Sequence, residues 1–172
     1  TTFPLLNAGT FYQGTYGTGT SDAFILKFDN AGNRLWATYA GGWNTDMGNS
    51  ITTDASGNVF VTGYAWGGGF PLQNAGTYYQ GSITGSGDIF IMKFTNTGAL
   101  LWSTYYVGGA VDEGNSIVTD AQGNIFITGS TASSAASFPL FNPGGGAYYQ
   151  GTKGGTWDAY MLKFDNSGNR LW

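Results

Sequence analysis

The 172-residue sequence contains neither cysteine nor histidine. Without cysteine there is no disulfide framework, no thiolate nucleophile and no Cys-ligated zinc site. Without histidine, Ser-His-Asp catalysis and histidine metal sites are excluded. Charge is also scarce, since 9% of the residues are charged and the net charge is −4. The six Lys and Arg residues are spread along the chain, so no basic patch is available for nucleic-acid phosphates. No apolar run approaches the length of a membrane span.

Glycine and aromatic residues are abundant instead, with 30 glycines and an aromatic share of 17%. Many glycines with few charges are typical of turn-rich all-β proteins and are common in secreted surface proteins. Hydrophobic residues make up 41% of the chain, which is enough for a core. The composition therefore predicts a folded all-β protein, and we expect it to be extracellular or at the cell surface.

One passage occurs three times along the chain. Each copy opens with Phe-Pro-Leu, continues with an aromatic-Tyr-Gln-Gly run, and reaches an apolar run that begins with Asp and ends with Lys-Phe. The openings lie at 3–5, 70–72 and 138–140, and the Asp-initiated runs at 22–28, 88–94 and 158–164. A period of 66 to 70 residues is too long for a helical solenoid unit and suits four strands with their loops.

The middle repeat contains four strand-like runs, at 49–53, 59–64, 89–94 and 100–106. Short Asp-x-x-Gly-Asn segments have the residues of hairpin turns, because Asp caps the turn and Gly accepts positive φ. They lie at 29–33, 54–58, 120–124 and 165–169, with a degenerate copy at 95–99. The strand runs are apolar on both faces, which favours sheets stacked as propeller blades over a two-sheet sandwich.

These repeats predict β-propeller blades of four antiparallel strands, arranged as a half blade (22–41), a full blade (47–107) and another full blade (114–172). The small, polar run at 48–54 suits an innermost strand and 35–42 an outer one. Alternating strands place the short turns on one face and the long loops on the other, which is the natural binding face. About two and a half blades form an incomplete ring, so we expect either further blades in a longer chain, the favoured interpretation, or copies that complete one another, which form a filament if they do not close.

The repeated passages resemble the bacterial β-propeller repeat family called SBBP. The resemblance lies in Phe-Pro-Leu…Tyr-Gln, Asp-Ala-Phe-Ile-Leu-Lys-Phe-Asp, Trp-x-Thr-Tyr-x-Gly-Gly, Asp-x-Gly-Asn-Ser-Ile and Asp-x-x-Gly-Asn-Val-Phe-Val-Thr-Gly, and it covers nearly the whole chain. It implies a propeller module of large exported or cell-surface proteins. It implies no reaction and no catalytic residues.

Acidic residues recur where strands begin on the long-loop face. Asp46, Asp112 and Glu113 start the expected inner strands, so a full ring would place acids around the channel mouth. They could bind a cation such as calcium or, as the weakest alternative, act as a glycosidase pair. The favoured interpretation is that each caps its own loop, because an active site is normally built once and these acids repeat. We therefore assign no catalytic residue and no metal site, and expect no cofactor.

Aromatic residues on the long loops are candidate ligand-binding residues. Trp43, Trp66 and Trp157 do not follow the repeat, and Tyr79 and Tyr149 belong to repeated aromatic pairs. Tyr and Trp are common binding anchors, so a glycan or a surface protein could stack on them. The alternative for the repeated pairs is packing of the long loop across neighbouring blades. Lys27, Lys93 and Lys163 recur within apolar strands, and we expect them to reach a strand end or to pair with a loop carboxylate.

The leading hypothesis is a non-enzymatic β-propeller repeat module of an exported or cell-surface bacterial protein. It would serve surface attachment, protein interaction or structural assembly, the last including assembly into filaments. Its expected partners are further blades of the same protein or other copies of itself, and a glycan or surface protein. The alternatives are a glycan- or ligand-binding propeller that uses the aromatic long-loop face and, less favoured, a carboxylate-based glycoside hydrolase.

Overall fold

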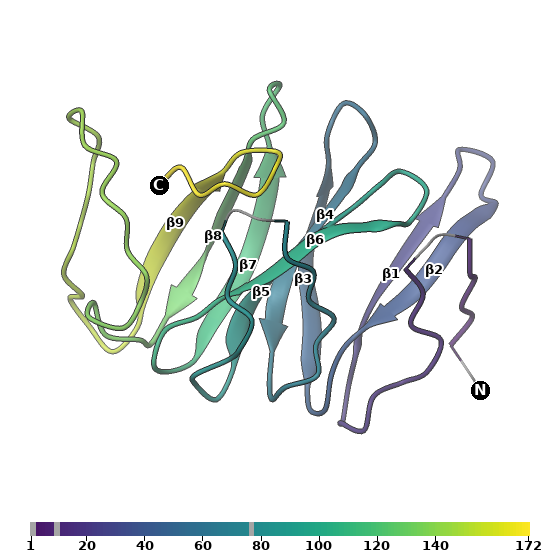
Figure 1. Ribbon diagram of the computed structural model, residues 1–172, viewed down its shortest axis with the longest axis horizontal. Coiled ribbons are helices and arrows are strands. Elements are labelled where there is room, and N and C mark those ends of the chain that lie inside the picture. The colour runs from purple at the N-terminus through teal and green to yellow at the C-terminus, as the bar shows by residue number, and fades with distance from the viewer. Residues whose placement is uncertain (1–2, 9–10, 76–77) are drawn as a thin grey trace.

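The computed structural model describes residues 3–8, 11–75 and 78–172, which form three antiparallel sheets and no helix (Figure 1). The first sheet pairs β1 (Ala23–Phe28) with β2 (Arg34–Ala40). The second has the order β3–β4–β5–β6, with β3 (Asp46–Thr53), β4 (Val59–Ala65), β5 (Asp88–Phe94) and β6 (Leu100–Tyr106). The third has the order β7–β8–β9, with β7 (Asp112–Thr119), β8 (Ile125–Thr131) and β9 (Asp158–Phe164).

The three sheets stand side by side in chain order, like consecutive blades, and the described residues form no closed ring (Figure 1). This confirms the predicted all-β class with antiparallel blades in an incomplete ring. The middle sheet has the four expected strands, and β3 begins at Asp46, three residues before the expected start. After β9, Arg170 bridges Phe164 in the register that pairs Leu100 with Phe94, so the region 114–172 holds three strands and the start of a fourth pairing.

Short turns of the predicted kind join the strands at one end of every sheet. In the turn that begins at Asp54, one carboxylate oxygen accepts the backbone N–H groups of Ser56 and Asn58, both at 2.9 Å, and the other accepts the Asn58 side-chain amide at 2.8 Å. Gly57 has φ of 74°, a conformation that Gly adopts without steric cost. The same bonds occur in the turns that begin at Asp29, Asp120 and Asp165. The predicted turn chemistry is confirmed.

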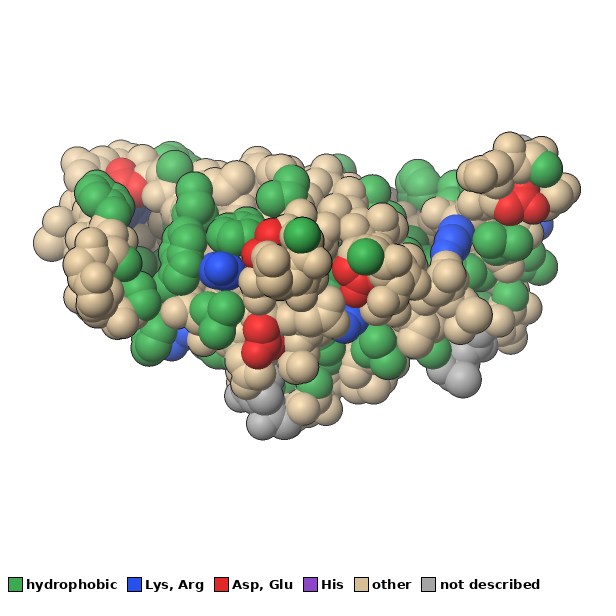
Figure 2. All heavy atoms as spheres, turned by 90° about the horizontal axis from the view of Figure 1, so that it is seen from above, with side chains coloured by type: hydrophobic (Ala, Val, Ile, Leu, Met, Phe, Trp, Pro, Cys, Tyr) green, Lys and Arg blue, Asp and Glu red, His purple; other side chains and the backbone are tan. Residues whose placement is uncertain are grey.

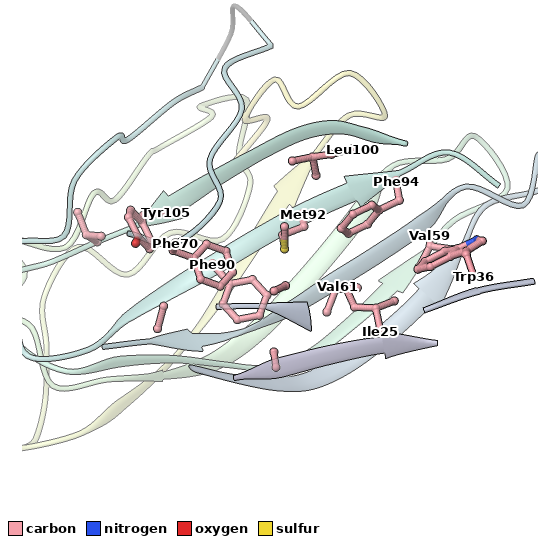
Figure 3. Packing of buried hydrophobic residues seen from close by; sticks show 14 residues of the cluster. Ile25, Trp36, Val59, Val61, Phe70, Phe90, Met92, Phe94, Leu100 and Tyr105 are labelled. Atoms are coloured by element: carbon pink, nitrogen blue, oxygen red, sulfur yellow. The ribbon is translucent and has the colours of Figure 1, made fainter. Parts of the chain in front are cut away.

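The core lies between the sheets rather than inside any of them. One cluster joins the first and second sheets and includes Ile25, Trp36, Val61, Phe90 and Phe94 (Figure 3). A second cluster joins the second and third sheets. All seven residues of β5 are buried, because their side chains alternate between the two clusters. Apolar residues on both faces of a strand are thus explained by a sheet on each side.

Long loops connect the strands at the end opposite the turns, which we call the long-loop face (Figure 1). The Phe-Pro-Leu passage anchors the loop before β5, since the Phe70 ring lies 4.5 Å from the Phe90 ring and 5.9 Å from the Tyr105 ring. Figure 2 shows the molecule from the turn end, where the acidic side chains of the turns are separated from one another. The structure thus presents two different ends, one of uniform turns and one of variable loops.

Candidate functional site

The first candidate acid, Asp46, lies at the start of β3 on the long-loop face and is 1% exposed. Its Oδ2 accepts the backbone N–H of Gly42 at 2.6 Å, and its Oδ1 has no hydrogen-bond partner. Burial raises the pKa of Asp46 to about 6, and the nearby Asp22 adds to the rise. A carboxylate so enclosed holds its loop in place and does not meet a solute.

Asp112 occupies the equivalent position at the start of β7 and is better satisfied. It accepts the backbone N–H of Gly108 at 2.9 Å, the Ser133 hydroxyl at 2.8 Å and the Thr131 hydroxyl. In the preceding repeat, Ala65 and Gly67 stand where Thr131 and Ser133 stand, so Asp46 lacks both hydroxyl donors. Equivalent acids in successive repeats therefore differ in how well their charge is stabilised.

A second set of acids, at the beginning of β5 and β9 and just before β1, also holds loops. Asp88 is fully buried, and its Oδ2 accepts the N–H groups of Thr84 and Gly85 at 3.2 and 3.4 Å. Burial raises the pKa of Asp88 to about 6, and the nearby Asp112 adds to the rise. Asp22 and Asp158 accept loop N–H groups in the same way. These bonds are the ones that the loop-capping interpretation requires.

Glu113 is half-buried, and its backbone carbonyl accepts the Tyr160 hydroxyl at 2.9 Å. The electrostatic neighbours of the buried acids come from the adjoining sheet, Asp22 for Asp46 and Asp112 for Asp88. Among residues 3–8, 11–75 and 78–172, no three acidic side chains are grouped so as to ligate a metal. The candidate acids are thus spread over the separate contact regions between neighbouring sheets and do not form one cluster in the described residues.

The candidate tryptophans are exposed on the long loops, with exposed fractions of 64% for Trp43, 41% for Trp66 and 48% for Trp157. Trp43 and Trp66 lie on adjoining loops, because Trp43 donates its backbone N–H to Gly68 and Trp66 donates to Thr45. Trp157 lies on another long loop, just before β9 of the third sheet. The arrangement offers two neighbouring aromatic side chains and a third on a separate loop.

Tyr79 and Tyr149 keep the same surroundings in every repeat. Their exposed fractions, 39% and 41%, match the 39% of the equivalent Tyr12. Each ring lies against the glycine two residues later in the chain, Gly14, Gly81 or Gly151. The first members of the pairs behave differently: Phe11 packs on Phe94 and Tyr78 on Phe164, each in the next sheet. The first two pairs therefore each contribute one surface residue and one residue that packs against the next sheet, whereas both members of the third pair, Tyr148 and Tyr149, are exposed.

A groove of about 700 Å³ lies between the long loop 132–157 and the third sheet. Its walls include Phe141, Tyr148, Tyr149, Met161 and Trp172, and Figure 2 shows hydrophobic side chains beside the hollow at this end. In the middle repeat, β6 fills the corresponding space and pairs with the loop at Gln73. The sequence analysis missed this groove, although comparing the two repeats strand by strand would have indicated it.

The recurring lysines reach the turns of the next sheet. Lys27 donates to the backbone carbonyl of Asn96 at 3.0 Å, and Lys93 donates to that of Asn166 at 2.8 Å. Burial lowers the pKa of Lys93, and the charges of Asp54 and Asp165 oppose this. Lys93 also donates to the side-chain Oδ1 of Asn166. These two lysines thus reach the end of the neighbouring sheet, where Asn96 or Asn166 accepts the bond, and no carboxylate of the described loops does. Sequence reasoning missed these two asparagines because they belong to the turn of another sheet.

Comparison with known proteins agrees with this architecture. The model of a beta-propeller repeat, SBBP, matches residues 35–71 and 101–134. The chain is 28% identical over 174 residues to an uncharacterized WD repeat-containing protein, L264, of Acanthamoeba polyphaga mimivirus. This alignment covers 89% of the chain and 12% of the relative. The chain is also 28% identical over 151 residues to the regulatory protein FlaEY of Caulobacter vibrioides, which covers 88% of this chain and 15% of the relative.

The aligned region is thus a small part of each curated relative. In the described ranges, no helix has the length and apolar character needed to cross a membrane. Each matched segment runs from the last strand of one sheet through the first two strands of the next. The first segment covers β2, β3 and β4, and the second covers β6, β7 and β8. The chain thus carries two segments that match the SBBP beta-propeller repeat, in sheets that stand like consecutive blades.

Proposed function

We propose that this chain is a non-enzymatic propeller module of an exported or cell-surface bacterial protein. It serves protein interaction, surface attachment or structural assembly. The observation that carries the proposal is the exposure of apolar side chains on the outer faces of the first and last sheets. Phe28 is 52% exposed, whereas Phe94 and Phe164 at the equivalent positions are fully buried. Met161 is 58% exposed, whereas the equivalent Ile91 is fully buried.

Such exposure is unfavourable unless a further sheet of the same protein or the surface of another protein covers it. Burying a large apolar side chain stabilises by roughly 1.5–3 kcal/mol, and several such side chains lie on each outer face. An exposed apolar face of this kind marks an interaction site. The acids, in contrast, are buried and bound to their own loops, which supports a module without catalysis.

The absence of cysteine gives this proposal a clean test, because a single introduced cysteine is the only thiol in the chain. Ser82 is exposed on a long loop, and Met161 lies on the outer face of the third sheet. In intact cells that produce the protein, a membrane-impermeant maleimide should label Ser82→Cys rapidly and Met161→Cys slowly. Unfolding in urea should make the two labelling rates equal.

Three outcomes would contradict the proposal. Labelling of Ser82→Cys only after cell lysis would refute the extracellular location. Equal labelling of Met161→Cys and Ser82→Cys in the folded protein would show that the outer face is uncovered, and would refute the interaction role. Hydrolysis of chromogenic glycosides that is lost in Asp112→Asn would overturn the non-enzymatic assignment.

A second candidate function is glycan binding on the long-loop face. It is favoured by Trp43 and Trp66, which are exposed on adjoining loops at positions that do not repeat. Aromatic faces stack on the apolar faces of sugar rings. On a glycan array, Trp43→Ala and Trp66→Ala should each abolish retention, while Phe28→Ala, a change of an equally exposed aromatic far from these loops, should retain it. Retention that survives both tryptophan changes would exclude this candidate.

A further inference from the structure

We infer that Trp43 and Trp66 together form a binding site for uncharged glycans on the long-loop face. The inference rests on the second candidate function and deepens it by naming the ligand class and the way in which the two indoles are held. We call the packed contact between two neighbouring sheets a joint and number the joints in chain order. The site lies at the first joint, where the loop from β2 to β3 meets the loop that follows β4.

The indole of Trp43 lies against the glycine run 67–69. Its backbone N–H donates to the carbonyl of Gly68 at 3.0 Å. A Cβ built on Gly68 would lie 3.1 Å from the ring, and one built on Gly69 would lie 2.5 Å from the indole Nε1. Gly69 has φ of 83°, which glycine adopts without steric cost. Side chains at these two positions would displace the indole, so the glycines support it in its present place.

The indole of Trp66 lies on a further glycine. Trp66 directly follows β4, and Gly87 stands opposite it, just before β5, in the register that pairs Ala65 with Asp88. A Cβ built on Gly87 would overlap the indole. The backbone thus fixes both rings before a ligand arrives, while Trp43 and Trp66 stay 64% and 41% exposed. A ligand that stacks on them does not have to order them, and such preorganisation favours binding.

The two tryptophans are close enough to contact one ligand. Trp66 donates its backbone N–H to the carbonyl of Thr45 at 2.9 Å. This bond and the one from Trp43 continue the register of β3 and β4. In that register the two tryptophans are diagonal neighbours, which lie roughly 7–8 Å apart and within reach of aromatic side chains. One oligosaccharide can therefore extend over both rings.

The pair is present at the first joint and is replaced as a pair at the second. Counting from the strands, Gly109 and Ala132 occupy the positions of Trp43 and Trp66. The strands around them keep the same pairing without the tryptophans. A residue needed for packing would recur with the repeat, as the buried Trp36 does in both later copies. Replacement of the two together indicates a shared task other than folding.

The openness of the site is a property of the loops and does not depend on the outer sheets. Position 109, the equivalent of Trp43, is exposed although the complete middle sheet precedes it and the third sheet follows it. Trp66 follows a strand of the middle sheet, which has a sheet on either side (Figure 1). Both positions of the site are thus open in the interior of the row of sheets.

Charged side chains are missing from the segments around the two rings. Residues 11–21, 41–45 and 66–87, which belong to the long-loop face beside the site, include no Asp, Glu, Lys or Arg. The acids at their borders are engaged, because Asp46 is buried and Asp22 accepts the backbone N–H of Gly17 at 2.8 Å. A charged ligand would therefore find no partner of opposite charge in these segments.

Neutral hydroxyl and amide groups supply the polar part of the site. The Thr18 hydroxyl donates to the carbonyl of Trp43 at 3.4 Å. The hydroxyls of Thr20 and Thr45 share a hydrogen bond of 2.6 Å, and Asn44 is exposed. Uncharged sugars match this surface, since their rings have apolar C–H faces and their hydroxyls donate and accept hydrogen bonds. A protein surface matches it less well, because about a quarter of protein residues are charged and would lose hydration here without compensation.

A glycan array tests the ligand class. The probes are uncharged oligosaccharides of hexose and N-acetylhexosamine, each beside the same oligosaccharide with sialic acid or sulfate added. The uncharged members should retain the wild-type chain at least about tenfold better than their charged counterparts, because the added anion is desolvated without a cation to pair with. Retention should not fall between about 0.05 and about 0.5 M salt, since no ion pair is involved.

Titration calorimetry with the best-retained uncharged oligosaccharide tests the pair. The wild type should bind one oligosaccharide per chain, and Trp43→Ala and Trp66→Ala should each raise Kd at least about tenfold, because aromatic anchors dominate such interfaces. Trp43→Tyr keeps a stacking ring and should lose less affinity than Trp43→Ala. The matched control is Trp157→Ala, which removes a 48% exposed indole from a loop outside the site and should bind as the wild type does. Urea unfolding verifies that each variant is folded.

Equal retention of charged and uncharged glycans would overturn the ligand class and leave the glycan-binding candidate standing. Two oligosaccharides per chain, with one lost in each tryptophan variant, would overturn the shared site. Unchanged affinity in both alanine variants would overturn the whole inference. The absence of retention by any glycan would refute the inference together with the second candidate function, whereas labelling of Met161→Cys in cells decides the first proposed function independently.

Discussion

Equivalent aspartates in successive repeats should respond in opposite directions to the same substitution. Asp46 is buried with Oδ1 unpaired, and its pKa is raised from 3.8 to about 6. Asp112 accepts an N–H group and two hydroxyls. We expect Asp46→Asn to stabilise the chain at pH 7, because it removes a buried charge. Asp112→Asn should destabilise it, because the new amide turns a donor toward hydroxyls that now donate.

The magnitude follows from linkage. The folded chain keeps a proton on Asp46 between pH 3.8 and about 6, where the unfolded chain has released it. Stability therefore falls as the pH rises through this window, and the loss is complete above about pH 6. A pKa difference of this size corresponds to at most about 3 kcal/mol. Local relaxation reduces such values, so we expect about 1–2 kcal/mol from Asp46 and a similar amount from Asp88.

Other acids oppose this trend at lower pH. The side-chain amides of Asn33 and Asn124 lower the pKa values of Asp29 and Asp120, so these carboxylates lose their stabilising bonds as the pH falls below 3.8. Together the two groups of acids predict a stability maximum at about pH 4–5, between the ordinary pKa of 3.8 and the raised value of about 6.

Urea unfolding at a fixed, low chain concentration from pH 4 to 8 measures this prediction. Asp46→Asn should gain about 1–2 kcal/mol at pH 7 and flatten the decline between pH 4 and 6. Asp112→Asn should lose about 1–3 kcal/mol at pH 7. Equal effects of the two changes, or a stability that rises steadily from pH 4 to 7, would refute the assignment of buried, unevenly satisfied carboxylates.

Further predictions concern the hydroxyl donors, the glycine turns and the tryptophans of the joints. Ala65→Thr should supply Asp46 with the donor that Thr131 gives to Asp112, bring the pKa of Asp46 back toward 3.8 and add about 1 kcal/mol of stability at pH 7, as read by the same urea titrations. Gly98→Ala should destabilise the chain more than Gly32→Ala. Both glycines have positive φ, but only at Gly98 does the added methyl group meet the Trp36 ring, at 3.1 Å. Equal losses of stability in urea unfolding would contradict the packing of the tryptophan on this glycine. Trp102→Ala should lower the free energy of unfolding by about 3–5 kcal/mol and Trp172→Ala by less than half of that, because Trp102 is 5% exposed inside a joint and Trp172 lies on an open face.

The repeats made the fold accessible from the sequence. The Asp-x-x-Gly-Asn turns need only local bonds, so the residues within each turn determine it. The apolar runs on both faces of β5 required sheets on both sides, and the structure has them. These inferences succeeded because each depended on one segment or on its exact recurrence in the chain.

The candidate site was less predictable because it depends on differences between repeats. That Asp46 has an unpaired oxygen follows from Ala65, a residue on another strand, whose counterpart in the next repeat is Thr131. Lys27 donates to the backbone carbonyl of Asn96, which any residue could supply, whereas Lys93 donates to both the backbone carbonyl and the side-chain Oδ1 of Asn166. Contacts between sheets become visible in a sequence only when the strand order and the facing of each side chain are already known.

In the contact between neighbouring sheets, a lysine and a tryptophan of one sheet meet the turn of the next. This contact has a consequence for how such a protein changes in length. The turn contributes an asparagine, which accepts the hydrogen bond, and a glycine, on which the tryptophan lies. The residue between them varies and is Ala31, Thr97 or Ser167. Each sheet therefore presents the same kind of turn to the lysine and tryptophan of the sheet that precedes it. A gene duplication or deletion that removes or adds whole repeats rebuilds a complete joint at the new junction, so chains of different repeat number can arise in single steps without first passing through a poorly packed intermediate.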